Sequence, residues 1–152
     1  MSDLAKNKTH IVLVNAVIEK DGKILITQRS LEETHEPGKW TIPGGKVEKT
    51  AGDAWDILEK TLAREIEEEV DIKISETPKL LVNNTFIRST RQHVIALTFL
   101  CGWKSGEAKA LEDTIDVNWI YEKDLGSYDF APNVRTYIEK GFDFLRRYKF
   151  HK

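Results

Sequence analysis

DAWDILEKTLAREIEEEV, residues 53–70, carries the longest helical pattern in this chain of 152 residues. Apolar side chains recur at every fourth position and Trp55 falls on the same stripe, which is typical of a helix with one face against a core. The members of the repeat are Leu58, Leu62, Ile66 and Val70. Asp53 follows a glycine and is expected to cap the helix. The pattern therefore predicts an amphipathic helix from about Asp53 to Val70.

The second half of this stretch contains four glutamates, three of which are expected to project together. At 100° per residue, Glu65, Glu68 and Glu69 fall within about 100° of one another. Glu67 points nearly the opposite way, toward solvent. Acidic runs on helices are usually solvated faces, but here like charges repel one another near a helix C-terminus, where only Arg64 can pair with them. A divalent cation would offset the repulsion better, because hard cations prefer oxygen ligands.

The rest of the chain predicts a mixed sheet and one further helix. The expected strands are Ile11–Ile18, Ile24–Gln28, Trp40–Ile42, Leu80–Ile87, Val94–Trp103 and Val117–Tyr121. Asp21-Gly22 and Ser89–Gln92 are expected hairpin turns, and Pro43-Gly44-Gly45 is expected to end regular structure. Pro132 suits the first turn of a final helix, Pro132–Tyr148. We expect an α+β fold or an α/β/α sandwich, as one domain over residues 1–152 with its core at about 9–148.

The composition limits the class of protein. The net charge of -2 argues against a general nucleic-acid-binding protein, and the basic end Arg146–Lys149 has a local reason, since cations favour a helix C-terminus. Cys101 is the single cysteine, which excludes an internal disulfide. Because no signal peptide is recognised either, a cytoplasmic location is expected. No apolar run approaches the ~20 residues of a membrane span, so no membrane partner is expected.

Two motifs together resemble the Nudix box of the MutT-like hydrolases. That box consists of Gly, five residues, Glu, seven residues, Arg-Glu, an aliphatic residue, any residue and Glu-Glu. Gly44-Gly45-Lys46-Val47-Glu48 resembles its opening, and Arg64–Glu69 matches its second half completely. The order of elements over residues 9–145 resembles the α/β/α sandwich of the family. The resemblance thus covers nearly the whole chain.

The chain departs from the box in its middle. Gly45 and Arg64 are 19 steps apart, five more than the box has, so five residues are extra somewhere within Lys49–Asp56. The first acid of the box is therefore either Asp53 or Asp56, and the sequence leaves that choice open. Asp71 stands two positions after the last glutamate of the box, where a small residue such as glycine is expected.

The resemblance implies a centre for Mg²⁺, with Mn²⁺ as an alternative. The implied metal ligands are Glu65, Glu68, Glu69, the Gly44 carbonyl and a later loop acid, Asp113 or Glu112. Arg64 would orient the glutamates through a salt bridge. Ordinary loop acids are an equally good reading of Asp113 and Glu112.

The resemblance also indicates how a nucleotide would be held. The expected substrate-binding residues are Arg29, Gly45 and Asn133. Arg29 resembles an arginine that contacts substrate phosphate, and Asn133 resembles an asparagine that holds a purine base, although a solvated strand end and a helix start explain them as well. His35 and Phe86 fit a loop and a core better than a site.

The implied reaction is hydrolysis of a diphosphate bond in a nucleoside diphosphate linked to another group. Glu65 and Glu68 are the favoured general bases, with the acids of the later loop as alternatives. These features favour a nucleoside triphosphate pyrophosphohydrolase, with oxidised purine nucleotides as one target. An ADP-ribose or nucleotide-sugar pyrophosphatase is the alternative within the class, and a non-catalytic nucleotide sensor is the alternative outside it. Family members are often dimers, so a homodimer is compatible with the resemblance.

Overall fold

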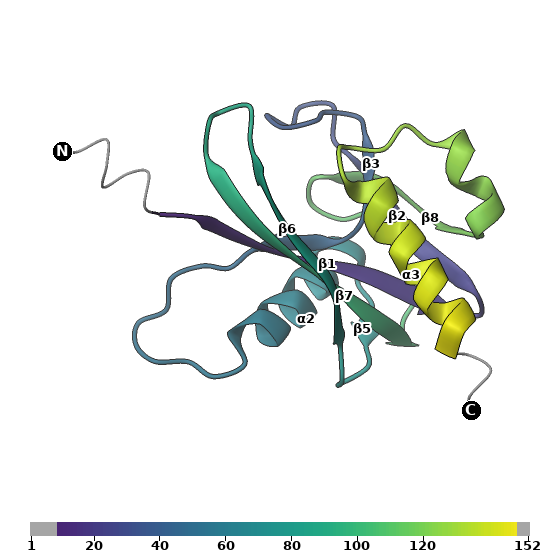
Figure 1. Ribbon diagram of the computed structural model, residues 1–152, viewed down its shortest axis with the longest axis horizontal. Helices are drawn as coiled ribbons and strands as arrows, with labels where there is room; N and C mark the ends of the chain where they lie inside the picture. Colours follow the sequence, from purple (N-terminus) through teal and green to yellow (C-terminus); the bar gives the residue numbers. More distant parts are fainter. Residues whose placement is uncertain (1–8, 149–152) are drawn as a thin grey trace.

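The structure is a computed structural model that describes residues 9–148 (Figure 1). The polar N-terminal segment, on which the expected absence of a signal peptide depends, and Lys149 of the basic end lie outside the described residues. Within 9–148, no helix is long and apolar enough to cross a membrane.

A mixed sheet runs through the centre of the molecule. The strands are β1 (Ile11–Lys20), β2 (Lys23–Arg29), β3 (Trp40–Thr41), β4 (Gly44–Lys46), β5 (Lys73–Ile74), β6 (Lys79–Ile87), β7 (His93–Ser105) and β8 (Thr114–Ile120). The helices are α2 (Ile57–Val70), the 3-10 helix η1 (Glu122–Ser127) and α3 (Val134–Tyr148). Strand β1 pairs in parallel with β7 and antiparallel with β2 and β4, while β6 pairs antiparallel with β7. All six predicted strands and both hairpin turns are present, although the last strand runs Thr114–Ile120 and not Val117–Tyr121. The final helix begins at Val134, because Asn133 at φ 73° lies outside the right-handed helical region, so the expectation of Pro132 in its first turn is wrong. β5 and η1 had no clear pattern in the sequence.

The two long helices cover opposite faces of the sheet (Figure 1). Successive side chains of a strand point to opposite faces, so Val14, Ala16 and Ile18 of β1 pack into the cluster beneath α2. Val17 of the same strand packs with α3 on the other face. The chain therefore forms the α/β/α arrangement that the sequence predicts.

Helix α2 keeps the predicted apolar stripe but begins later than expected. Leu62, Ile66 and Val70 are fully buried against the sheet. The expectation of a helix start and cap at Asp53 is wrong, because the helix begins at Ile57 and Asp56 precedes it in the left-handed region at φ 56°. Trp55 was expected on the stripe but is 81% exposed. Residues 48–56 are all exposed, and a helical extension without tertiary packing is only marginally stable.

Strand β3 ends before Pro43, as expected, but the expectation that Gly44 and Gly45 lie outside regular structure is wrong. Gly44 and Gly45 instead form β4, which pairs with β1. A Cβ atom on Gly44 would lie 2.2 Å from the Val14 carbonyl oxygen, so only glycine allows this approach of the two backbones. Gly141 in α3 has a related role, because a Cβ there would lie 2.6 Å from Cγ1 of Val17.

Candidate active site

The glycines of β4 lie directly against the glutamate face of α2. The Gly44 amide donates a hydrogen bond to Oε2 of Glu69 at 3.3 Å. A Cβ atom on Gly45 would lie 2.4 Å from Cδ of Glu65, so this side chain fills the space that the glycine leaves open. The structure therefore brings together the two motifs that the sequence places about twenty residues apart.

Arg64 holds two of the three converging glutamates. Its Nη1 lies 3.3 Å from Oε1 of Glu65 and 3.4 Å from Oε2 of Glu68. Glu67 points away from them, as its helical position predicts, and pairs with Nζ of Lys73 at 3.0 Å. The orienting contacts expected of Arg64 are thus present, and Glu67 is separate from the glutamate face.

Burial makes Glu69 an unusual carboxylate. Desolvation raises its pKa to about 7, although hydrogen bonds from the Gly44 amide and the Thr114 hydroxyl favour the charged form. Burial also raises the pKa of Glu65, and the charges of Glu68, Glu112 and Glu48 raise it further against the opposing effect of Arg64. Negative charge therefore exceeds positive charge around Glu65.

The carboxylate oxygens of the glutamate face are of the type that a hard divalent cation prefers. Carboxylate oxygens are the ligands that Mg²⁺ prefers, and crowded, partly desolvated carboxylates gain most from a cation. Within the described residues 9–148, the structure contains no group of three or more Asp, Glu, His or Cys side chains that is already arranged to hold a metal ion. Arg64 pairs with Glu65 and Glu68, while Glu69 is bound to Gly44. A cation would thus compete with Arg64 for these oxygens.

The raised pKa of Glu69 predicts a pH-dependent stability of the metal-free protein. Between its ordinary value of 4.5 and its folded value of about 7, the folded state retains a proton that the unfolded state has lost. The stabilisation is present below about pH 4.5 and is lost as the pH rises through 7. In chelator, the free energy of unfolding should fall by a few kcal/mol between pH 5 and pH 7.5, since one unit of pKa corresponds to about 1.4 kcal/mol. Glu69→Gln should flatten this decline in denaturant titrations; an unchanged pH profile would contradict the assignment.

The two loop acids differ in what they contact. The charge of Glu112 acts on Glu65, and the main-chain carbonyl oxygen of Asp113 accepts a hydrogen bond from the Ser30 amide at 2.8 Å. Both remain candidates for the later metal ligand. The charge of Glu48 also raises the pKa of Glu65, although the sequence motif does not predict Glu48 as a site residue. Its place three residues after Gly45 could have indicated it, because β4 lies against the glutamate face.

The choice between Asp53 and Asp56 for the first acid of the motif stays open. Both are exposed and precede α2. Neither is among the charges that shift the pKa of Glu65 or of Glu69.

A cavity of about 380 Å³ extends from the glutamate face across the sheet. The three residues expected to bind substrate all line this cavity: Arg29, Gly45 and Asn133. Gly44 and Glu69 line it as well. Asn133 immediately precedes α3 with φ at 73°, a conformation that asparagine tolerates better than most residues. One space therefore joins Glu69, an arginine and the residue expected to contact a base, while Glu65 and Glu68 are not among the residues that line it.

The wall of this cavity includes side chains that the sequence did not single out. Arg88 lines it from the β6–β7 turn, and Tyr137 lines it from α3. The Tyr137 hydroxyl donates a hydrogen bond to Oδ1 of Asn84 at 2.5 Å, which joins α3 to β6. Phe86, expected to be a core residue, also faces the cavity. The period of two in β6 could have placed Asn84, Phe86 and Arg88 on one face, but not against α3.

His35 and Arg29 also line the cavity and contact each other. Nε of Arg29 donates to the His35 carbonyl oxygen at 2.8 Å, and Nη2 of Arg29 lies 3.1 Å from Oε2 of Glu33. The His35 ring lies 3.4 Å from the Ser89 hydroxyl. His35 lines the cavity as well.

The family follows from a match that spans most of the chain. The model of the NUDIX domain matches residues 8–140. The chain belongs to the NUDIX family. The glycine motif, the glutamate helix and the cavity that Gly44, Gly45 and Glu69 line are thus parts of a NUDIX domain.

Relatives of this NUDIX chain cover it almost fully. An ADP-ribose pyrophosphatase of Methanocaldococcus jannaschii is 33% identical over 141 residues, which cover 90% of this chain and 79% of that protein. The nucleoside triphosphatase NudI of Escherichia coli O17:K52:H18 is 30% identical over 133 residues, covering 82% of this chain and 89% of that protein. The crystal structure of a MutT NUDIX hydrolase from Burkholderia pseudomallei superposes with a TM-score of 0.74 at 30% identity, covering 88% of this chain and 98% of that one.

These findings confirm the expectation of a MutT-like NUDIX hydrolase and of its fold. They also confirm the enzyme class, a pyrophosphohydrolase that acts on nucleotides. NUDIX hydrolases generally require a divalent metal. The sequence motifs therefore gave the correct class of chemistry before any contact was known.

Proposed function

We propose that this NUDIX enzyme hydrolyses nucleoside triphosphates to a monophosphate and pyrophosphate. The observation that carries the proposal is the single cavity that joins Glu69 to Arg29 and Asn133. It offers the Glu69 carboxylate beside the metal site, Arg29 for phosphate and Asn133 for a base edge. The similarity to a protein named nucleoside triphosphatase supports the same substrate class.

The proposed metal is Mg²⁺, held by Glu65, Glu68 and Glu69, with the Gly44 carbonyl and one of the loop acids Asp113 and Glu112 as further candidates; Mn²⁺ is the alternative. When bound, such a cation neutralises charge on the diphosphate and activates a water. The residues of the chain would orient the carboxylates, accept the proton of the water and bind the substrate. Arg64 keeps the carboxylates of Glu65 and Glu68 on one side of α2.

The proton of the attacking water needs an acceptor beside the diphosphate. Glu65 is the better candidate base, because its pKa is raised by burial and by neighbouring carboxylates, which brings its basicity closer to neutral pH. Glu68 is more exposed and is the second candidate. Arg29 would bind a phosphate oxygen, and Asn133 would contact the base.

ADP-ribose hydrolysis is the second candidate function. It is favoured by the similarity to the protein from Methanocaldococcus jannaschii, which is named an ADP-ribose pyrophosphatase. The same glutamate face would serve, since the reaction again breaks a diphosphate bond. A nucleotide sensor without catalysis would need a glutamate face that is incomplete, whereas here all three glutamates are present.

The test is product analysis on a panel of substrates. The protein is incubated with Mg²⁺ and, separately, with the common and oxidised purine triphosphates, ADP-ribose and a dinucleoside polyphosphate. We expect a nucleoside monophosphate and pyrophosphate from a triphosphate. Turnover of ADP-ribose alone would favour the second candidate, and turnover of none would contradict an enzyme.

The proposal also includes one catalytic domain over residues 1–152, which the NUDIX match to 8–140 supports. A cytoplasmic location, a homodimer and the lack of nucleic-acid and membrane partners are part of it. Arg146 and Arg147 pair with Glu122 and Asp143. Their charges thus have local partners, which supports the absence of a nucleic-acid surface.

A further inference from the structure

Two arginines line one cavity, and among the described residues only one of the two has an acidic ion-pair partner. Arg29 and Arg88 both line the cavity. Arg29 pairs with Glu33 at 3.1 Å. Arg88 is partly buried and forms no ion pair within the described residues 9–148. A partly buried cation without an anionic partner is costly, and a bound anion removes that cost.

The charges follow an order along the cavity wall. Arg29 pairs with Thr114 between β2 and β8, and the Thr114 hydroxyl donates to Oε1 of Glu69 at 3.2 Å. On its other side, Nε of Arg29 donates to the His35 carbonyl oxygen, and the His35 ring lies 3.4 Å from the hydroxyl of Ser89, the neighbour of Arg88. The sequence along the wall is thus the glutamate face, then Arg29, then Arg88. An elongated anion would meet the three in that order.

We infer that Arg88 binds a third phosphate of the substrate, beyond the two that flank the cleaved bond. The inference rests on the proposed function, because it assumes that the cleaved diphosphate lies at the glutamate face beside Arg29. A guanidinium suits a terminal phosphate, which offers several oxygens to its fork of donors. ADP-ribose has neutral sugars on both sides of its diphosphate and offers no such group. Arg88 therefore selects nucleoside triphosphates over ADP-ribose.

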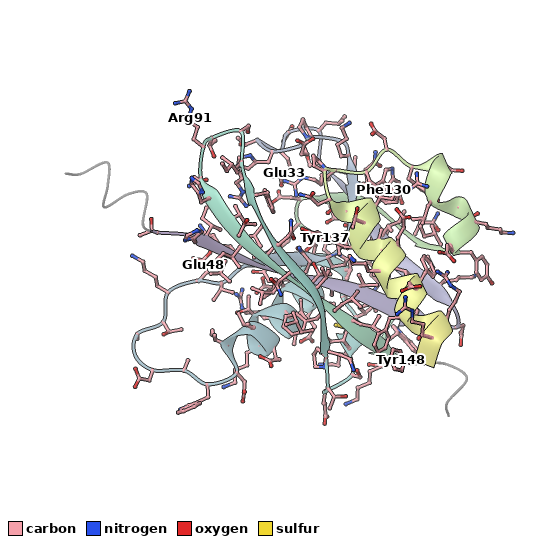
Figure 2. The ribbon with its side chains drawn as sticks, in the orientation of Figure 1. Glu33, Glu48, Arg91, Phe130, Tyr137 and Tyr148 are labelled. Carbon is pink, nitrogen blue, oxygen red and sulfur yellow. The ribbon has the colours of Figure 1, made fainter. Side chains whose placement is uncertain are left out.

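The first test compares kcat/KM for GTP and ADP-ribose in Arg88→Gln, Arg88→Lys and Arg91→Gln. Arg91 is the matched control: it stands on the same hairpin, is exposed and points away from the body of the molecule (Figure 2). Arg88→Gln should lower kcat/KM for GTP about 10- to 100-fold, mainly through KM, as the loss of a charge-assisted hydrogen bond does. Its value for ADP-ribose should stay within about twofold, Arg88→Lys should recover part of the loss, and Arg91→Gln should match the wild type.

The second test measures binding of inorganic tripolyphosphate by calorimetry, without turnover. Arg88→Gln should weaken binding about tenfold or more, whereas Arg91→Gln should not. Equal losses for GTP and ADP-ribose, or unchanged tripolyphosphate binding, would overturn the role of Arg88 and leave the proposed function intact. If no nucleotide is hydrolysed, the proposed function fails, and the tripolyphosphate measurement alone then decides whether Arg88 binds a phosphate.

Discussion

Replacement of Glu68 by Gln is expected to lower kcat by about 100-fold or more, the usual range for loss of a group that handles the reacting water or its metal. The substitution keeps the size of the side chain and removes the charge. The folded state should persist, because the Glu68 side chain is 43% exposed and its ion pair is with Arg64. Steady-state kinetics with GTP and thermal unfolding of the same sample check both parts.

Glu67→Gln is the control for that substitution. Glu67 is adjacent in sequence but pairs with Lys73 on the other side of the helix. Its variant should keep kcat within about twofold, since exposed ion pairs contribute little. Full activity in Glu68→Gln, or an equal loss in both variants, would remove the glutamate face from the proposed mechanism.

Gly45→Ala should produce the second large effect. Its new methyl group would fall 2.4 Å from Cδ and 2.6 Å from Cγ of Glu65, so this side chain must move. A displacement of about 1 Å at a reacting group can cost about 100-fold in rate. We therefore expect kcat/KM to drop by about that factor while the protein stays folded, because a side chain can yield where a backbone cannot.

Gly52→Ala provides the matched control for Gly45→Ala. A Cβ atom on Gly52 meets no atom within 4 Å, and Gly52 is exposed in the loop before α2. Its activity should equal that of the wild type. Wild-type rates in Gly45→Ala would show that the position of Glu65 is unimportant to the chemistry.

Local patterns predicted the scaffold well. The stripe through Leu62, Ile66 and Val70 fixed the buried side of α2, and this placed Glu65 and Glu69 against the sheet without any knowledge of tertiary contacts. Side-chain direction along a helix depends on spacing alone. Helical spacing alone likewise places Glu67 on another side of α2 from the other glutamates, and there Glu67 pairs with Lys73.

The failures share a cause, which is dependence on contacts distant in sequence. The β4 strand exists because Gly44 can approach the backbone of Val14, thirty positions earlier, and glycine-rich sequence alone predicts a turn. Trp55 fitted the helical stripe, yet no core surface reaches it. Arg88 faces the cavity only because the β6–β7 hairpin lies opposite Arg29, and no local signal reports such a pairing.

The central claim is that the face formed by Glu65, Glu68 and Glu69 binds a divalent cation. Titration with Mn²⁺, followed by electron paramagnetic resonance of the free ion, tests it without turnover. We expect the wild type and Glu67→Gln to bind Mn²⁺ equally, and Glu68→Gln and Glu69→Gln to bind it at least about tenfold more weakly, because a carboxylate ligand is lost. Equal Mn²⁺ affinity in all four proteins would contradict the account.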